Sequence, residues 1–284
     1  MFAPQKASVK RIAYASPMAA TLASIHIYPL KSCAPLPLNA ASVQRRGIAH
    51  DRRWLIVDED NRFITAREHP RLTLIRATID DHGLHLTAPE MPELRVDIPR
   101  ADAPRITVTI WDDRVSPLAA DARANSWIVA FLGKPCTLVY MDENCVRMTD
   151  PDWSAPGDEV SFADGHPLLL ISQASVDHLN ERLQTPVPAL RFRPNLLVEN
   201  TEAHAEDGWK RIRIGDIEFD LVKPCIRCVF PNIDFSTGTF DPTGEPLRTL
   251  IKYRRTPKGV AFGQNLIPRG VGTLRAGDPV TVLI

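Results

Sequence analysis

The sequence predicts a mainly β protein with a few helices, of the α+β class. Short apolar runs that alternate with polar residues recur along the chain, and turns rich in Gly, Pro and Asp separate them. Many short strands at such spacing are typical of a barrel or a sandwich. Helical periodicity is confined to three segments. We therefore expect a β-barrel-like N-terminal lobe followed by a second lobe that is itself built on a β-barrel.

The strands are predicted from alternating apolar residues and from the turn residues that flank them. In the first half they are residues 22–28, a hairpin of 53–58 with 62–66, and then 72–79, 84–88, 94–98 and 106–110. In the second half they are residues 211–214, 217–222 and 280–284. The change in pattern after the first group places the lobes at residues 21–112 and 113–284.

Three segments are predicted to be helices. Residues 120–132 place Trp127, Ile128, Phe131 and Leu132 on one face, and Gly133 is the expected C-terminal stop. Residues 173–183 form the second, with either Ser172 or Ser175 as its N-cap. Residues 247–254 form the third.

Composition excludes several classes of protein. The 284 residues are 44% apolar and 24% charged, as in ordinary globular proteins, and Lys+Arg equals Asp+Glu at 34 each. Zero net charge gives no global attraction to nucleic acid. Without an apolar run of membrane-spanning length, we expect no membrane span. Residues 1–20 are expected to be a flexible tail, with an amphipathic transit peptide as the alternative.

Five cysteines, an odd number without disulfide-like spacing, indicate a reducing compartment, and we expect a cytoplasmic protein. Cys225 and Cys228 form the one C-x-x-C pair, with Arg227 between them. A structural zinc site needs four Cys or His ligands, but the last His of the chain is His204. Pro231 argues against the helix that a thioredoxin-type pair would open. A soft thiolate beside a cation suits a soft metal, and the alternative is a pair of packed core thiols.

Several motifs, in a fixed order, resemble those of a known family. Residues 28–32 (YPLKS), 51–57 (DRRWLIV) and 65–67 (TAR) are similar to the N-terminal β-barrel of MOSC proteins. Residues 192–195 (FRPN), 225–228 (CIRC), 262–265 (FGQN) and 277–278 (GD) resemble the MOSC domain. The resemblance runs from about residue 20 to the end of the chain, and it is to the amidoxime-reducing component family with its YcbX-like bacterial relatives.

The resemblance implies a molybdenum cofactor, in which a phosphate-bearing pterin holds the metal through a dithiolene. It implies Cys228 as the metal ligand and catalytic residue, and it implies that cofactor-binding positions are Lys31, Ser32, Arg52 and Arg193. Asn195 and Asn265 are further candidates for polar cofactor contacts. Arginine offers a planar fork to phosphate oxygens and lysine a point charge, so cations from three separate segments fit such a ligand.

Alternatives remain at several of these positions. Surface cations and salt-bridge partners are common, and Asp51 stands next to Arg52 as a local ion-pair partner. Cys225 is expected to be a packed neighbouring thiol. His166, where some family members carry hydroxyl residues, is either a ligand contact or an ordinary loop histidine. Asp234 is expected to cap a turn, with a role in protonation as the alternative.

The resemblance also implies the reaction, which is reduction of N-hydroxylated small molecules by oxygen-atom transfer. The sequence contains neither the C-x4-C-x2-C run of a plant-type ferredoxin nor a dinucleotide fingerprint. We therefore expect a separate electron donor, either a ferredoxin-like protein or a flavin reductase. The alternative is a non-catalytic cofactor-binding or sulfur-carrier module, since MOSC domains also occur in molybdenum cofactor sulfurases. The absence of a pyridoxal-phosphate domain from this sequence weighs against the sulfurase reading.

Overall fold

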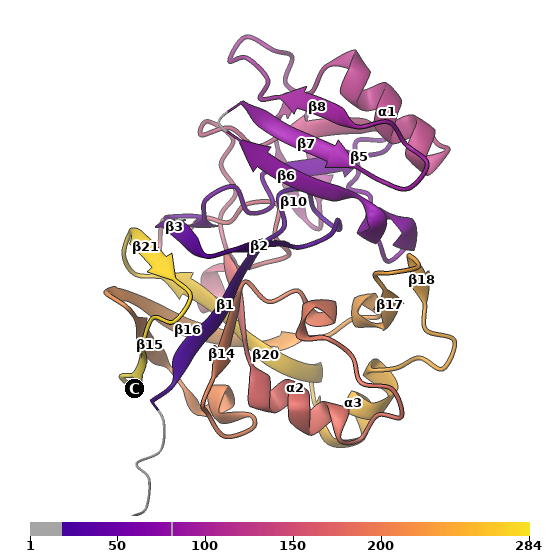
Figure 1. The fold of residues 1–284 in the computed structure, drawn as a ribbon. Helices are drawn as coiled ribbons and strands as arrows, with labels where there is room; N and C mark the ends of the chain where they lie inside the picture. Colours follow the sequence, from indigo (N-terminus) through magenta and orange to yellow (C-terminus); the bar gives the residue numbers. More distant parts are fainter. Residues whose placement is uncertain (1–18, 81) are drawn as a thin grey trace, which may run out of the picture.

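The computed structural model describes residues 19–80 and 82–284, so residues 1–18 of the predicted flexible tail lie outside the described residues. Two lobes are stacked, and the lower one is built on a nine-stranded sheet (Figure 1). The strand order of this sheet is β2 (Leu36–Leu38), β1 (Thr21–Ile27), β14 (Leu196–Glu199), β13 (Leu168–Ser172), β20 (Gly259–Pro268), β16 (Ile217–Ile226), β15 (Arg211–Ile214) and β22 (Val280–Val282). The short β19 (Arg255–Thr256) pairs with β20 off this path.

The upper lobe is made of small sheets around its own core. They are β6–β7–β8 (Arg76–Asp80, Gly83–Thr87, Leu94–Asp97), β11–β12–β5 (Leu118–Ala119, Thr137–Tyr140, Trp54–Val57) and β9–β10 (Val108–Ile110, Asp113–Val115). The core packs Leu30, Trp54 and Leu86 against Trp127 and Phe131. In the lower lobe, β17 (Ile233–Asp234) pairs with β18 (Thr239–Phe240) beside the large sheet. Strands dominate, which confirms the predicted α+β class.

The N-terminal strands join the lower lobe. Strand β1 pairs antiparallel with β14 and lies second from one edge of the large sheet, beside β2. Strand β3 (Ala40–Gln44) pairs with β4 (Gly47–Ile48) and with β21 (Gly272–Arg275) from the other end of the chain. The chain then enters the upper lobe at β5 and returns to the large sheet at β13. The boundary at residues 112–113 stays a prediction, but the strands within residues 21–44 of the predicted N-terminal lobe pair with β14 and β21.

Within the described residues there are three α-helices, in the three predicted places: α1 (Ala122–Leu132), α2 (Gln173–Asn180) and α3 (Leu247–Tyr253). The side chain of Asp121 caps α1 by accepting from the Ala124 N–H at 2.7 Å, and Gly133 ends it with a left-handed φ of 70°. Ser172 is the N-cap of α2. None of these helices is long and apolar enough to cross a membrane.

Three sequence predictions about strands need correction. Residues 62–66 do lie against the predicted hairpin partner, since Ile64 N–H donates to the Ile56 carbonyl at 2.8 Å, but they form only isolated bridges, from Phe63 to Val57 and from Arg62 to Thr109, and no continuous strand. Residues 70–74 form a 3-10 helix, with Pro70 in its first turn, so the strand that was predicted from residue 72 begins at residue 76. Strand β16 continues to Ile226, which places Cys225 on a strand.

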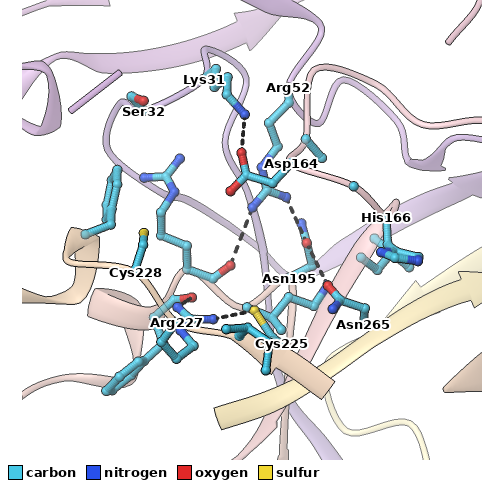
Figure 2. Close-up of a pocket in the computed structure, with 18 of the residues that line it drawn as sticks. Lys31, Ser32, Arg52, Asp164, His166, Asn195, Cys225, Arg227, Cys228 and Asn265 are labelled. Carbon is cyan, nitrogen blue, oxygen red and sulfur yellow. Dashed lines mark hydrogen bonds and ion pairs between the residues drawn. The ribbon is translucent and has the colours of Figure 1, made fainter. Parts of the chain in front are cut away.

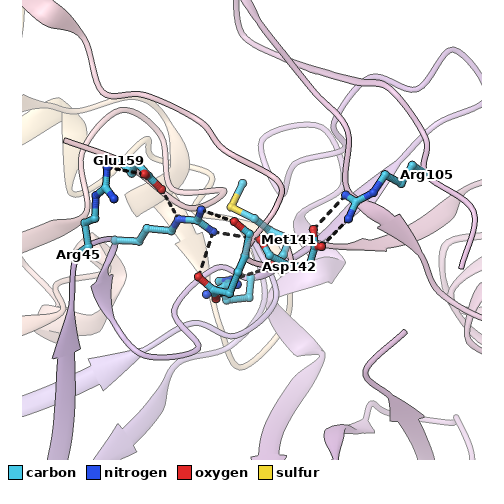
Figure 3. Close-up of polar contacts among 8 residues, drawn as sticks. Arg45, Arg105, Met141, Asp142 and Glu159 are labelled. Carbon is cyan, nitrogen blue, oxygen red and sulfur yellow. Dashed lines mark hydrogen bonds and ion pairs between the residues drawn. The ribbon is translucent and has the colours of Figure 1, made fainter. Parts of the chain in front are cut away.

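A buried ion-pair network fastens the segment that leads from the upper lobe back to the large sheet (Figure 3). Arg46 donates to the Glu159 carboxylate at 2.6 Å and to the carbonyls of Asp142 and Glu143 at 3.1 Å each. Arg46 and Glu159 are both buried, and Arg105 holds Asp142 from the other side. Forming a buried ion pair of this kind costs desolvation free energy. Removing one partner is strongly destabilising, because the other charge is then left buried and unpaired. The network therefore fixes the start of the chain segment that forms one wall of the site.

Gly263 in β20 provides a test of the backbone around the site. Its φ is +81°, and a Cβ there would lie 2.6 Å from Ile171 and 2.9 Å from the Leu170 carbonyl oxygen. We expect Gly263→Ala to lower the free energy of unfolding by about 2–4 kcal/mol, since overpacking adds to backbone strain. Gly133→Ala is the matched control, because φ there is +70° with open space around it. It should cost only about 1–2 kcal/mol. Urea unfolding measures both, and equal losses would contradict the crowding argument.

Candidate functional site

One pocket lies where the two lobes meet, with a cavity of about 140 Å³. It is lined by all seven residues that the sequence singled out: Lys31, Ser32, Arg52, Arg193, Asn195, Cys228 and Asn265. They come from the loop after β1, the turn before β5, the start of β14, the end of β16 and the middle of β20 (Figure 2). Side chains from five separate segments thus converge on one cavity, and five cations line it against a single carboxylate, that of Asp164.

Two of the arginines share one aromatic platform. The guanidinium carbons of Arg52 and Arg193 lie 4.3 Å and 3.9 Å from the ring centroid of Tyr28. Tyr28 is fully buried, and its hydroxyl donates to the carbonyl of Pro194 at 3.0 Å. Cation–π contacts of this kind gain strength when they are desolvated. The ring therefore fixes both guanidinium planes at the pocket wall.

Arg52 also forms an ion pair with the neighbouring Asp51, as its sequence position allowed. Asp51 is buried, and a second carboxylate oxygen accepts from the Tyr28 N–H at 2.8 Å. Burial raises the pKa of Asp51, against the opposing effect of Arg52. Burial also disfavours the charged form of Arg193 and so lowers the pKa of its guanidinium to about 10. The site therefore holds desolvated charges that are only partly compensated inside the protein.

The backbone at three pocket residues is strained. Ser32, Arg52 and Arg193 have φ values of 71°, 49° and 58°, in the left-handed region that side chains other than Gly, Asn and Asp rarely adopt. Such residues cluster at functional sites, where the surrounding structure imposes them. Here the strain turns three side chains of one pocket away from the direction that a regular strand would give them.

Lys31 is almost fully buried and is held at its amino group. Its Nζ donates to the Phe162 carbonyl at 2.8 Å and to the Asp164 carboxylate at 2.6 Å. Burial is the main effect on the ammonium group and lowers the pKa of Lys31 to about 8, against the attraction of Asp164. Desolvation acts to raise the pKa of Asp164, but the charge of Lys31 outweighs it and the net shift is downward.

Asn195 and Asn265 differ in how many of their side-chain amide atoms are free to bind a ligand. Asn195 is fully buried, and its Oδ1 accepts from Arg52 at 2.8 Å and from the Leu169 N–H at 3.2 Å, while its Nδ2 donates to the His26 carbonyl at 3.0 Å. Its amide is thus committed to holding Arg52 in place. Asn265 donates from Nδ2 to the Lys223 carbonyl at 3.2 Å, which leaves its Oδ1 available to the pocket.

The two cysteines of the C-x-x-C pair have different surroundings. Cys225 is partly buried near the end of β16, where its sulfur accepts from Arg227 Nη1 at 2.9 Å. Cys228 follows the strand, is exposed and faces the pocket. The other three cysteines are buried away from solvent, and burial raises the pKa of Cys33, Cys136 and Cys145. Of the five thiols, Cys228 is therefore the most accessible to a ligand in the cavity.

Three buried polar atoms on the pocket wall lack a partner among the described residues: His166 Nε2, Arg193 Nη2 and Arg227 Nε. Unsatisfied buried donors are rare in native proteins, and each calls for an explanation such as a missing ion or ligand. Burial, together with the charge of Lys223, lowers the pKa of His166 to about 4, so its imidazole is neutral at pH 7. The wall is therefore prepared for a polar, electron-rich group.

The sequence reasoning missed the role of Asp164, which pairs with Lys31, and the contacts of Arg227, which bridges Cys225 to the Phe192 carbonyl at 2.6 Å. Arg227 stood inside the quoted C-I-R-C motif, so its position was the available signal, whereas nothing in the sequence paired residue 164 with residue 31. Asp234 caps a turn as predicted, since its carboxylate accepts from the N–H and the hydroxyl of Ser236.

Comparison with known proteins identifies two family domains in this chain. Residues 19–135 match the MOSC N-terminal beta barrel domain and residues 157–281 match the MOSC domain. The chain belongs to the MOSC family of the amidoxime-reducing components. It is 34% identical to human mitochondrial amidoxime-reducing component 1 over 93% of this chain and 83% of the relative.

Two other relatives show how far this family extends. The chain is 32% identical to component 2 of Rattus norvegicus over 92% of this chain and 82% of the relative. It is 31% identical to the molybdenum cofactor sulfurase of Oryza sativa subsp. japonica over 85% of this chain, but over only 32% of that longer protein. The amidoxime-reducing relatives are named as mitochondrial, so the cytoplasmic location that the cysteines suggested stays a prediction.

The charge of Lys31 gives the pocket a testable pH dependence. Because its pKa lies near 8, the ammonium loses its proton as the pH rises through that value, and anion binding weakens with it. We expect the affinity for sulfate, which does not titrate in this range, to fall severalfold between pH 7 and pH 9.5. Lys31→Arg should remove this dependence, since arginine stays charged. Calorimetric titration measures it, and a wild-type affinity that is constant over this range would contradict the prediction.

Proposed function

We propose that this MOSC-family chain binds a molybdenum cofactor in the pocket between its lobes and reduces N-hydroxylated compounds. The observation that carries the proposal is the position of an exposed thiol, Cys228, in the same cavity as the Lys31, Arg52 and Arg193 cations. The names of the relatives support it, because they are amidoxime-reducing components and a molybdenum cofactor sulfurase. A second observation supports the choice of ligand, namely the unpaired donors on the pocket wall.

The residues present fit that cofactor. Its phosphate needs cationic donors, and Arg193 Nη2 is buried without a partner while its other nitrogen, Nη1, donates to the Cys33 carbonyl at 2.6 Å. Its dithiolene brings sulfur to the metal, so one protein thiolate completes the soft ligand set. Within residues 19–80 and 82–284, no group of three or more His, Cys, Asp or Glu side chains is arranged to hold a metal by itself. A metal that arrives with its own ligands suits this pocket.

When bound, the cofactor supplies the metal that accepts the oxygen of the N–O group. The protein holds it by Cys228 sulfur at the metal and by Lys31, Ser32, Arg52 and Arg193 at the anionic end. Asn195 acts through Arg52, and Asn265 offers its carbonyl oxygen to the pocket. The overall reaction consumes two electrons and two protons, breaks the N–O bond, and releases the N–H product and water. The electrons come from a separate redox protein.

The identity of the metal ligand can be tested at the two cysteines. Cys228→Ser should abolish reduction of benzamidoxime with a reduced dye, because a hydroxyl is a poor ligand for a soft metal. Cys225→Ser is the matched control and should keep part of the activity, since its sulfur interacts with Arg227. Molybdenum content measured on the same samples shows whether metal is retained. Full activity of Cys228→Ser with the metal still bound would contradict the assignment of Cys228 as the metal ligand.

The anchor can be tested at Arg193, because loss of Arg52 would also leave the buried Asp51 without its partner. A charge-assisted hydrogen bond is worth about 1.5–3 kcal/mol, so Arg193→Ala should weaken cofactor binding by roughly one to two powers of ten. Arg193→Lys should restore only part, because lysine has no planar fork. Arg191, which is two residues away and pairs with Asp234, provides the control Arg191→Lys. Pterin fluorescence after oxidation reports occupancy, and full occupancy in Arg193→Ala would exclude this anchor.

A sulfur-carrier role is the second candidate, and the likeness to the rice sulfurase favours it. The two roles differ in what happens at Cys228. A reductase turns over benzamidoxime with dye electrons and keeps its metal. A sulfur carrier instead takes the outer sulfur of a persulfide donor onto Cys228, with the donor released as its thiol, and shows no such turnover. Mass spectrometry of the intact chain, together with the dye assay, separates them.

A further inference from the structure

The surface around the exposed Cys228 combines apolar side chains with unpaired cations. Ile226 and Val229, on either side of Cys228 in the chain, are 37% and 45% exposed. Scattered exposed apolar residues are ordinary, but two bulky ones beside an exposed thiol at the edge of a pocket form a local patch. Such an apolar centre is what protein interfaces bury.

The cations come from the hairpin that lies beside this patch. Arg227 donates its N–H to the Val260 carbonyl at 2.7 Å, and Val260 pairs in turn with Arg255 of β19. The Cβ of an alanine at position 259 would lie 2.6 Å from Ile226, so the hairpin packs directly on the patch. Since neighbouring strands are about 4.8 Å apart, the backbone of Arg255 lies within roughly 10 Å of Arg227.

This hairpin and the helix before it are strongly basic. Residues 246–260 contain five cations and no acidic residue, in a chain whose formal net charge is zero. Two of the five are engaged, since Arg248 pairs with Glu245 and Arg254 pairs with Asp207. The other three, Lys252, Arg255 and Lys258, are exposed and have no carboxylate partner among the described residues.

Beyond the two ion-paired carboxylates of Glu245 and Asp207, acidic side chains occur near Trp153, on which Lys258 packs. The amino group of Lys258 stands 4.8 Å from the ring centroid of Trp153, which lies next to Asp152 in the chain and close to Asp150. Asp150 contacts Lys223 at 3.9 Å and lines a second cavity of about 600 Å³ that shares Asp164 and Gly165 with the site. The opening of the pocket is therefore acidic on this second-cavity side and basic on the Cys228 side.

We propose that the surface of Ile226, Cys228, Val229, Arg255 and Lys258, here called the Cys228 rim, is the docking site for a small acidic electron-carrier protein. The inference rests on the proposed reductase function, which needs two electrons per turnover from a separate donor. Complementary charge steers such encounters and sets their orientation more than it adds affinity. In the proposed complex, the apolar pair beside Cys228 forms the buried centre of the interface, and the unpaired cations form its polar edge. Docking here brings the donor to the proposed metal ligand.

The test uses the cofactor-loaded protein and a reduced plant-type [2Fe–2S] ferredoxin as the acidic probe. The variant is the double charge reversal Arg255→Glu/Lys258→Glu. The matched control is Lys210→Glu/Arg275→Glu, which makes the same change in net charge at exposed positions near β15 and on β21, at the other end of the molecule (Figure 1). Both variants are assayed with ferredoxin and with reduced methyl viologen, using benzamidoxime as the substrate.

We expect the rim variant to raise the KM for ferredoxin by roughly tenfold or more at low salt, with the dye-driven kcat unchanged. The control should stay within about twofold of the wild type. The wild-type KM should rise with ionic strength, and that dependence should flatten in the rim variant. Biolayer interferometry with immobilised ferredoxin should show the same loss of binding, independently of turnover.

Three results would overturn the docking site. They are an unchanged KM and affinity in the rim variant, an equal effect in the control, and no ferredoxin binding by the wild type. Equal binding of a duplex DNA oligonucleotide would assign the cations to nucleic acid instead and would also reject it. A wild-type protein that binds ferredoxin through the rim but never reduces benzamidoxime with dye would instead reject the proposed function and leave the docking surface standing.

Discussion

The stacking of two arginines on the buried ring of Tyr28 is the constraint on which the pocket depends. Like charges repel, and burial removes the water that would screen them. The fold offsets this cost with Asp51 beneath Arg52, with the carbonyl of Cys33 for Arg193, and with the ring itself. The compensation is incomplete, because Arg193 Nη2 remains unpaired. An anionic ligand that accepts from Arg193 would complete it, so the electrostatic cost of gathering these cations becomes a driving force for anion binding.

The same constraint explains why neither lobe can form the site alone. Tyr28, Lys31 and Arg52 follow strands at the N-terminal end, whereas Arg193 and Cys228 belong to segments of the lower lobe. The pairing of β1 with β14 in the large sheet and the pairing of β3 with β21 join these segments through backbone hydrogen bonds. The buried Arg46–Glu159 pair then fixes the wall that carries Asp164. Damage to the interface between the lobes should therefore affect the pocket before it affects either core.

The opening of the pocket is asymmetric in charge, and this separates two tasks that the reaction needs. The proposed function would need a substrate and a donor protein to approach the same pocket, and one opening of uniform charge would make the two compete. The acidic side lies at the second cavity, and the basic side lies at Cys228. Because the chain has no net charge, this separation is visible only in the arrangement of residues in space.

The sequence by itself determined the fold class, the three helices and the family, because alternating strands, caps and ordered motifs are local signals. It also singled out seven residues that line the pocket, since each stands in or beside a motif. The tertiary structure decided their tasks. Asn195 turned out to be committed to Arg52, and Asp164 to Lys31, through contacts between residues more than a hundred positions apart. The continuous strand predicted at residues 62–66 is reduced to isolated bridges, one of which runs to the distant Thr109. Long-range pairing of buried polar groups leaves no periodic signature in a sequence, so only the folded chain reveals which cations remain free for a ligand.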